Sequence, residues 1–443
     1  MTHWQPVILT TDFLLWLIIA MLLFGWTKQR HSIGWQRLMH MPLAVAAGMV
    51  LLTYVSIALL DSLHFREQLP GATLQYSIDV RSVLDDLLQS LNTMREKTYS
   101  APLSTHLFVK EQVMFPDGHV ARIWPRLHLN HPDHPSAERR ILYGILLGVL
   151  SSTVLGSLVH WRRQRYQPID RQFPWRTAWI TLTLLCIGVG IIAQVGGEFH
   201  LLGTDKIGQD VLYLSIKSIR TDLLFGALAT LVTLPLAVVL GISAGYVGGW
   251  IDDAIQYIYT TLNAIPGILL IAAAVLLMQG YIENHTTHFN SIALRADFRL
   301  LSLCIILGMT SWTGLCRLLR GETLKLRELD YVHAARALGV SSWRIMWRHV
   351  LPNLSHLILI SLVMDFSGLV LTEAVLSYLG LGVDPAMASW GNMINAGQLE
   401  LAREPVVWWP LASAFIFMFL LVLSANLLAD SAREAYDPLG RRA

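Results

Sequence analysis

The sequence predicts an all-α polytopic membrane protein with about nine transmembrane helices. Hydrophobic residues make up 54% of the 443-residue chain and charged residues only 14%, whereas a soluble domain carries roughly a quarter charged residues. Nine apolar stretches also reach the roughly 20 residues that a helix needs to cross a bilayer. The expected spans are 7–26, 41–60, 141–160, 177–195, 222–245, 258–279, 300–319, 357–378 and 410–429.

Lysine and arginine residues predict the orientation of the chain, because short basic loops stay in the cytoplasm. They gather in 27–40, 161–176, 317–348 and the C-terminal tail, and alternating spans place these four segments on one side. The N-terminus is then outside and the C-terminus cytoplasmic, as expected in a bacterial plasma (inner) membrane. The first apolar run has no basic residue before it and no clear cleavage site, so we expect a retained helix.

The long polar segment 61–140 is expected to form a small extracytoplasmic region, because long loops cross the membrane largely regardless of their charge. Its apolar residues are scattered, but five of them have helical spacing and predict a helix. These five are Val83, Leu84, Leu87, Leu88 and Leu91.

Motifs for several kinds of chemistry are absent from the sequence. The dipeptide Gly-Lys does not occur, so no phosphate-binding loop can form, and there is no HExxH motif. Cys186, Cys304 and Cys316 lie in apolar runs without paired spacing and are expected to be free thiols. We therefore expect a chain without an ATPase site, cofactor or nucleic-acid partner.

The basic, amphipathic segment Tyr331–Asn353 separates two apolar spans and predicts two short helices. In the first, Tyr331, Ala334, Ala335 and Leu338 share one face, where the alanines would let another surface approach closely. Gly339 can adopt the left-handed turn that ends a helix.

The second short helix would begin at Ser341, a residue type that caps helices. It presents an apolar face with Arg344 and Arg348 on the other side, and Pro352 is expected to end it. That apolar face consists of Trp343, Met346, Trp347 and Val350. On these residues alone, a helix pair that merely rests on lipid headgroups stays an open alternative.

Four blocks of the sequence, in order between about 175 and 443, resemble one transporter family. The alanine pair, the glycine and the Leu-Pro at 351–352 resemble the "EAA" loop of ABC importer permeases. The pattern is similar to the second-permease ("C-type") subunits of dipeptide, oligopeptide and nickel importers. The other blocks are HLLGTDKIGQDV (200–211), AGYVGGWIDD (244–253), and LTEAVLSYLGLG (371–382) followed by SWGNMI (389–394).

The resemblance implies a six-helix type I permease core at 177–443, with a coupling loop at 320–356. In that loop, a coupling helix would dock on a cytoplasmic ATPase through Asp330, Ala334, Ala335, Gly339 and Pro352. The implied partners are a homologous second permease, two ABC ATPase domains that bind ATP, an extracytoplasmic solute-binding protein and a peptide-like substrate, within membrane lipid.

The rest of the chain would form a three-helix N-terminal extension. It comprises two transmembrane helices in 1–60, the extracytoplasmic region 61–140, and a third helix with a cytoplasmic linker in 141–176. The usual six-span member has no counterpart of residues 1–160, and their role is open. The sequence also departs from the family pattern at His333, where a glutamate is usual, and at Gln209 and Leu214, where arginines are usual. Whether His333 alters coupling is open.

Two carboxylates are candidates for the translocation path. Asp365 lies well inside a span, where a charge is costly and usually faces protein or water. It would line the path or pair with a polar group on a neighbouring helix. Glu373 lies towards the outer face and would shape the entrance or cap a turn.

Two further patterns could be functional sites, but each also has a purely structural interpretation. GISAG (241–245) matches a hydrolase nucleophile motif at Ser243, but it ends a membrane helix and its glycines favour helix packing, as do Gly144 and Gly148. His128, His131 and His134 are three apart and could bind metal, although neighbouring prolines favour a solvated loop.

The sequence as a whole predicts the permease subunit of an ATP-driven importer for peptides, which works by alternating access. Nickel or another solute of the same family is an alternative cargo. Rival classes are an ion-coupled secondary transporter, which would use intramembrane charges, and a membrane-embedded hydrolase that uses Ser243.

Overall fold

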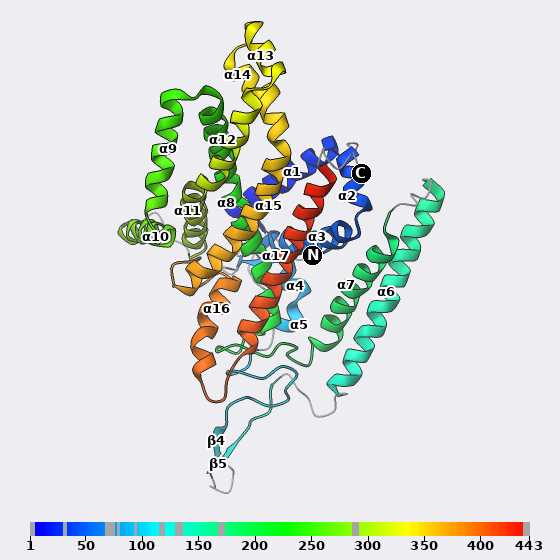
Figure 1. Cartoon of the computed structure of the whole chain (residues 1–443). Helices are drawn as coiled ribbons and strands as arrows, with labels where there is room; N and C mark the ends of the chain where they lie inside the picture. Colours follow the sequence, from blue (N-terminus) through cyan, green and yellow to red (C-terminus); the bar gives the residue numbers. More distant parts are fainter. Residues whose placement is uncertain are drawn as a thin grey trace. The chain divides into compact units, whose positions relative to one another are not determined.

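A computed structural model shows an all-helical membrane fold with a few short strands (Figure 1). It describes residues 5–29, 33–66, 76–77, 80–92, 95–114, 120–128, 136–166, 173–285 and 292–436. Within these residues, 8 helices are long and apolar enough to cross a membrane, and Thr10–Met21 is a shorter apolar stretch. The polytopic all-α prediction is therefore confirmed.

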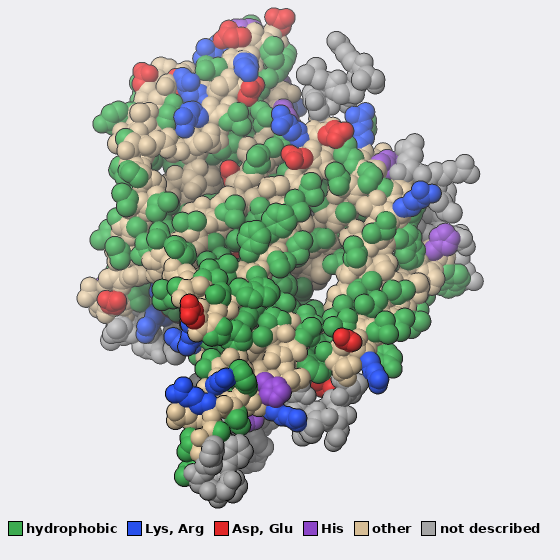
Figure 2. All heavy atoms as spheres, turned by 60° about the horizontal axis from the view of Figure 1, so that its bottom comes forward, with side chains coloured by type: hydrophobic (Ala, Val, Ile, Leu, Met, Phe, Trp, Pro, Cys, Tyr) green, Lys and Arg blue, Asp and Glu red, His purple; other side chains and the backbone are tan. Residues whose placement is uncertain are grey.

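The apolar helices follow the predicted order of spans. They are α1 (Thr10–Gln29), α3 (Pro42–Asp61), α6 (Ala137–Tyr166), α7 (Trp175–Val195), α8 (Val211–Val247), α10 (Gly267–Asn284), α11 (Ile292–Ser311) with α12 (Thr313–Arg327), α15 (Leu351–Tyr378) and α17 (Trp409–Tyr436). Hydrophobic side chains cover most of the helical surface in Figure 2, as expected for helices that face lipid.

The predicted span 258–279 is wrong, because the chain breaks inside it. Helix α9 (Gly249–Ala264) ends before Ile265, whose backbone is extended at φ −90° and ψ 131°, and α10 begins after Pro266. Proline lacks an N–H group and disfavours helical geometry in the residue before it. The apolar composition hides this break from a count of hydrophobic residues.

The chain forms two compact units. Unit 1 comprises residues 1–8, 36–221 and 388–424, and unit 2 comprises residues 9–35, 222–387 and 425–443. Unit 1 holds α3, α6, α7 and the polar segment 61–140. Unit 2 holds most of α8 together with α9 to α15.

Unit 1 contains short strands, within residues 5–7 and 64–123, that the sequence did not predict. Strands β1 (Gln5–Val7), β2 (His64–Arg66) and β3 (Arg81–Ser82) form an antiparallel sheet, and β4 (Glu111–Met114) pairs with β5 (Val120–Ile123). The predicted helix near 83–91 is present as α4 (Val83–Leu87) and α5 (Gln89–Asn92), interrupted at Leu88. Further short helices are α2 (Ile33–His40), α13 (Asp330–Ala337), α14 (Ser342–Ile345), η2 (Met346–Val350), α16 (Trp390–Gln398) and η3 (Leu399–Ala402).

Glycines allow α6 and α7 to pack backbone to backbone within unit 1. A Cβ at Gly148 would come 2.4 Å from the Cα of Ile187, and a Cβ at Gly190 would come 2.3 Å from the carbonyl oxygen of Gly144. Any side chain there would push the helices apart. The predicted small-residue packing of Gly144 and Gly148 is confirmed.

Unit 2 uses the same device between α8 and α12. A Cβ at Gly241 would lie 2.7 Å from the Cys316 carbonyl oxygen, and one at Gly245 would lie 2.6 Å from the Cβ of Thr323. The glycines of GISAG therefore serve helix packing, as predicted. Cys304 and Cys316 are buried free thiols, and Cys186 is half-buried and free.

Candidate functional site

The predicted coupling loop forms a bent pair of short helices at the tip of the hairpin made by α12 and α15 (Figure 1). We call residues 329–351 the elbow. It contains α13 (Asp330–Ala337), α14 (Ser342–Ile345) and the π-helical turn η2 (Met346–Val350). Both short helices lie where the sequence predicts them.

Gly339 sets the bend of the elbow. Its φ of +77° lies in the left-handed region that favours glycine. The N–H of Val340 donates to the carbonyl oxygen of Ala335 at 3.1 Å, and the N–H of Gly339 donates to that of Arg336 at 3.0 Å. This pair of bonds is a Schellman motif, so the predicted helix end at Gly339 is confirmed.

The inner side of the elbow is anchored in the core of unit 2. Val332, Ile345 and Val350 are each 0% exposed, and they share one apolar cluster with residues of α8 and α12. Ala335 and Met346 are also buried in this cluster. The elbow is therefore held firmly against the helices on which it stands.

The outer side of α13 is open. Leu338 is 84% exposed and Tyr331 is 41% exposed, and Ala334 is exposed between them. The fourth member of the predicted face, Ala335, turns inward with Val332 instead. The structure thus leaves an apolar surface with a small residue at its centre.

Charged and capping residues of the elbow lie at its rim. Asp330 is exposed in the first turn of α13, where a carboxylate complements the helix dipole. His333 is exposed, and its Nε2 lies 3.7 Å from a carboxylate oxygen of Glu328. Ser341 occupies the predicted N-cap of α14, but its hydroxyl makes no capping hydrogen bond.

The prediction that Pro352 ends the second short helix is wrong. The helix runs on from Ser342 through η2 into α15, as far as Tyr378. In η2 the N–H of Leu351 donates to the carbonyl of Met346, one residue further back than in an α-helix. This wider turn makes room for the proline ring, which would otherwise clash with a carbonyl of the preceding turn.

An ion pair links α12, the helix that leads into the elbow, to α9. Arg320 of α12 donates to Asp252 of α9 through Nε at 2.5 Å and through a second nitrogen at 2.7 Å. Such bidentate pairs fix geometry as well as adding energy. Asp252 belongs to the block AGYVGGWIDD, whose role had no structural explanation from sequence.

The two path candidates differ in their surroundings. Asp365 is half-buried on α15 and, within the described part of the chain, makes no hydrogen bond or ion pair. Glu373 is only 1% exposed, and its carboxylate accepts a hydrogen bond from the Ser377 hydroxyl at 2.6 Å.

Asp365 lies in a stripe of polar and small residues along α15. Ser361, Asp365, Gly368 and Thr372 follow helical spacing, so they share one face. A Cβ at Gly368 would meet nothing within 4 Å, and neighbouring Met364 is 61% exposed. This face of a membrane-spanning helix is therefore open within the single chain.

The block HLLGTDKIGQDV makes hydrogen bonds to the polar segment 61–140 of unit 1. We call residues 95–107 together with 200–210 the clasp. The N–H of Ser100 donates to the Thr204 hydroxyl at 2.6 Å, and that hydroxyl donates to the Thr98 carbonyl at 2.9 Å. Gly203 has a φ of +71°, and a Cβ there would lie 2.4 Å from the Ser100 carbonyl oxygen.

A buried histidine joins two carboxylates in the clasp. Nδ1 of His200 lies 2.7 Å from Asp210 and Nε2 lies 3.9 Å from Glu96. Burial alone would lower the pKa of His200, but the two carboxylates raise it to about 9. Sequence reasoning missed Glu96, because nothing in its local pattern indicates a partner about a hundred residues away.

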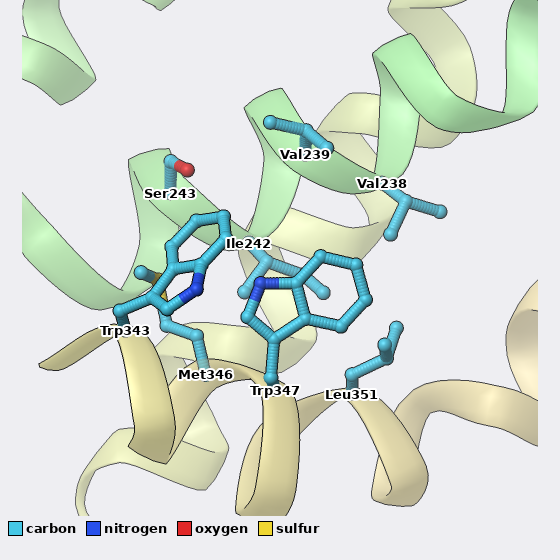
Figure 3. A pocket seen from close by; sticks show the side chains of 8 residues that line it. All are labelled: Val238, Val239, Ile242, Ser243, Trp343, Met346, Trp347 and Leu351. Carbon is cyan, nitrogen blue, oxygen red and sulfur yellow. The ribbon is translucent and has the colours of Figure 1, made fainter.

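The predicted histidine cluster stays untested. His131 and His134 lie outside the described residues, and among the described residues no group of three or more His, Cys, Asp or Glu side chains has an arrangement that could hold a metal ion. Ser243 faces tryptophans and aliphatic side chains in a cleft, shown in Figure 3.

Comparison with known proteins now identifies the family. Residues 237–442, which include the elbow, match the family described as "Binding-protein-dependent transport system inner membrane component". Over 241 residues the chain is 35% identical to the glutathione transport system permease protein GsiD of Pectobacterium atrosepticum, covering 54% of this chain and 72% of that protein. The chain belongs to this permease family.

Other relatives of the permease have similar names. Identity is 32% over 250 residues to the oligopeptide transport system permease protein OppC of Mycobacterium tuberculosis, covering 56% of this chain and 79% of that one. It is 30% over 243 residues to the dipeptide transport system permease protein DppC of Bacillus subtilis, covering 55% and 70%. The predicted C-type resemblance is confirmed.

Proposed function

We propose that this permease is one transmembrane subunit of an ATP-driven importer for peptides or peptide-like solutes. The relatives are named for oligopeptide, dipeptide and glutathione transport, and glutathione is itself a short peptide. Family membership supports a subunit that forms half of the path and relies on separate subunits for ATP hydrolysis.

The observation that carries the proposal is the elbow, which is rigid on one side and open on the other. Leu338 and Tyr331 expose apolar surface, and covering a leucine side chain contributes about 1.5–3 kcal/mol. In our proposal a groove on a cytoplasmic ATPase receives this side of α13, with Ala334 allowing close approach. Gly339 and the buried inner side then transmit the motion of the ATPase to α12 and α15.

The open stripe of α15 is proposed to line the path together with a homologous second permease. Asp365 would meet the ammonium group of a peptide, because a carboxylate that has no partner among the described residues of its own chain can pair with a cation there. Glu373, held by Ser377, would shape the outer end. Alternating access would then be a rigid-body rocking of helices between two states.

The proposed orientation follows the basic loops. The elbow and the C-terminus are cytoplasmic, and the clasp and the N-terminus are outside. We keep the proposed division into an extension of three helices with an extracytoplasmic region and a core at 177–443. An extracytoplasmic solute-binding protein would deliver the cargo.

One substitution tests the docking role directly. Leu338→Glu places a charge on the open side of α13 and should lower co-purification of the ATPase subunits at least about tenfold, which corresponds to about 1.4 kcal/mol. Leu399→Glu is the matched control, because Leu399 is 78% exposed in η3. Equal co-purification of the two variants would contradict the docking role.

A second experiment tests the path. Asp365→Asn should raise the KM for uptake of peptides with a free amino terminus by about tenfold and leave N-acetylated peptides unaffected, since the lost interaction is one charge pair. Asp253→Asn on α9 is the control, because Asp253 is exposed. The same change in KM for both classes of peptide would argue against the ammonium pairing.

A further inference from the structure

An apolar cleft lies between α8 and the second half of the elbow (Figure 3). Val238, Ile242 and Ser243 of α8 line one wall, and Trp343, Trp347 and Leu351 line the other. The cleft is a groove that is open on one side, and its enclosed part measures about 20 Å³. Ser243 is the one residue among these six with a hydroxyl group, so the lining suits a hydrocarbon chain.

The two tryptophans at the cleft are open to the surroundings. Trp343 is 60% exposed and Trp347 is 47% exposed, and their rings meet edge to face with centroids 5.5 Å apart. Figure 3 shows both indole rings projecting towards α8. Tryptophan is enriched at the boundary between hydrocarbon and headgroups, because its ring is apolar and its N–H is polar.

Two arginines accompany the tryptophans along the same helix. Arg344 and Arg348 each follow one tryptophan by a single residue, and both are exposed. Each arginine leaves the helix about 100° around from the tryptophan before it and does not line the cleft itself, but its side chain is long enough to bring the guanidinium round to the mouth of the cleft. Within the described part of the chain these two arginines have no ion pair, whereas Lys325 and Arg327 are paired with glutamates.

We propose that this cleft binds one anionic phospholipid. An acyl chain would lie along the open side of this groove, against the tryptophan rings and α8, and the guanidinium groups of Arg344 and Arg348 would bind the phosphate. Guanidinium matches phosphate geometry, and basic pockets beside membrane helices are suited to anionic headgroups. A zwitterionic lipid fits less well, because its own cation meets the two arginines.

The lipid site is separate from the docking surface of α13. The docking surface consists of Tyr331, Ala334 and Leu338 on the first helix of the elbow, whereas the cleft belongs to the second helix and α8. The lipid would contact both the elbow and α8. These contacts would stiffen the elbow, which in our proposal transmits the motion of the ATPase. The inference stands whether or not the permease carries peptides.

Native mass spectrometry of the full chain with its co-purifying subunits provides the test, using micelles with equal amounts of phosphatidylglycerol and phosphatidylcholine. The wild type should retain about ten times as much phosphatidylglycerol as phosphatidylcholine, since each basic residue contributes to attraction of anionic lipid. Arg344→Gln with Arg348→Gln should abolish the preference. Replacing both arginines with lysine should restore part of it.

The matched control is Arg37→Gln with Arg433→Gln, which removes two exposed arginines elsewhere and should leave the preference unchanged. Ser243→Leu fills the cleft and should reduce retention of both lipids while the arginines remain. The same preference in the Arg344 and Arg348 double variant as in the wild type would overturn the proposal.

Three other outcomes would also overturn the lipid site. Displacement of the bound lipid by excess inorganic phosphate, with no effect of Ser243→Leu, would show a site for free phosphate. An equal loss of preference in the control variant would show bulk attraction by charge. Retention only after the other subunits dissociate would show that a protein surface covers the cleft.

Discussion

The elbow and the clasp belong to sequence blocks that resemble the same family, yet they are built in opposite ways. The elbow leaves apolar side chains outside, with Leu338 84% exposed. The clasp takes polar side chains inside, where Thr204 is 0% exposed and His200 is 1% exposed. The chain buries the polar side chains of the clasp within its own fold. It leaves apolar side chains of the elbow exposed.

This difference suggests a separate role for each block. Buried polar groups must find partners within the fold, and Ser100, Thr204 and His200 of the clasp find them in other residues of the clasp. Exposed apolar surface leaves free energy to be gained when a partner covers it. The clasp therefore stabilises the permease itself, whereas the elbow keeps an exposed apolar surface that, in our proposal, another protein covers.

The largest expected effect concerns the bend of the elbow. Gly339→Val puts a β-branched residue at a φ of +77°, although nothing lies within 4 Å of the added Cβ. The altered bend should reduce peptide uptake in proteoliposomes at least about tenfold, since a 1 Å misplacement in a transmitting element can cost that much. ATP hydrolysis by the assembled complex should continue, so uptake per ATP falls.

Gly380→Val is the matched control for this variant. Gly380 also has a φ of +77° with nothing within 4 Å, and it likewise ends a helix, α15. Its backbone strain is the same, but it lies outside the elbow. An equal fall in uptake per ATP in the two variants would show that strain, rather than coupling, explains the loss.

The next effect concerns the charge of the clasp. Because the pKa of His200 is raised from 6.5 to about 9, its protonated form stabilises the fold fully below pH 6.5, and this contribution is lost as the pH rises through 9. Raising the pH from 7 to 10 should remove about 2 to 3 kcal/mol of stability. Thermal unfolding of the purified permease across this range measures the loss.

His200→Gln tests whether the histidine is responsible for that pH dependence. The variant should be less stable at pH 7 and should lose less stability between pH 7 and 10. Variants of elbow residues should keep the full dependence, because the elbow contributes no such buried charge. If stability depended on pH in His200→Gln as it does in the wild type, a group other than His200 would be titrating.

A smaller effect is expected at Thr204. Thr204→Val keeps the shape of the side chain but leaves the Ser100 N–H and the Thr98 carbonyl without their partner. The cost should be about 1–3 kcal/mol of unfolding free energy, read as a lower midpoint in thermal unfolding. Thr204→Ser keeps the hydroxyl and should recover most of the loss; failure to recover would implicate the methyl group instead.

The smallest effect is expected for the outer side of the elbow. Leu338→Ala removes a side chain that touches little of its own chain, so stability should change by less than about 0.5 kcal/mol. Uptake should still fall, because the surface for the partner is reduced. If Leu338→Ala lost as much stability as Thr204→Val, the elbow would stabilise the fold as the clasp does. That result would contradict the difference between the two regions.

Much of this architecture follows from the sequence, because the apolar stretches are long enough to be recognised by length alone. The helix end at Gly339 was also predictable, since a left-handed turn favours glycine. Helix packing at Gly241 and Gly245 followed from their spacing. These features depend on local patterns.

Features that depend on tertiary context were missed. Pro352 continues a helix only because the π-turn before it widens, and no composition predicts that. The short strands have too few residues for an alternating pattern. The clasp joins segments 104 residues apart at Ser100 and Thr204, which a reading of single motifs cannot connect.

Site-directed cross-linking tests the central claim, that a separate ATPase holds the elbow. The measurement places a cysteine at Ala334 in a permease whose three native cysteines are replaced, and treats the assembled, transport-active complex with a short thiol cross-linker. Our account predicts a covalent product with the ATPase subunit from Ala334→Cys and none from Leu399→Cys. An active complex in which Ala334→Cys forms no such product would contradict it.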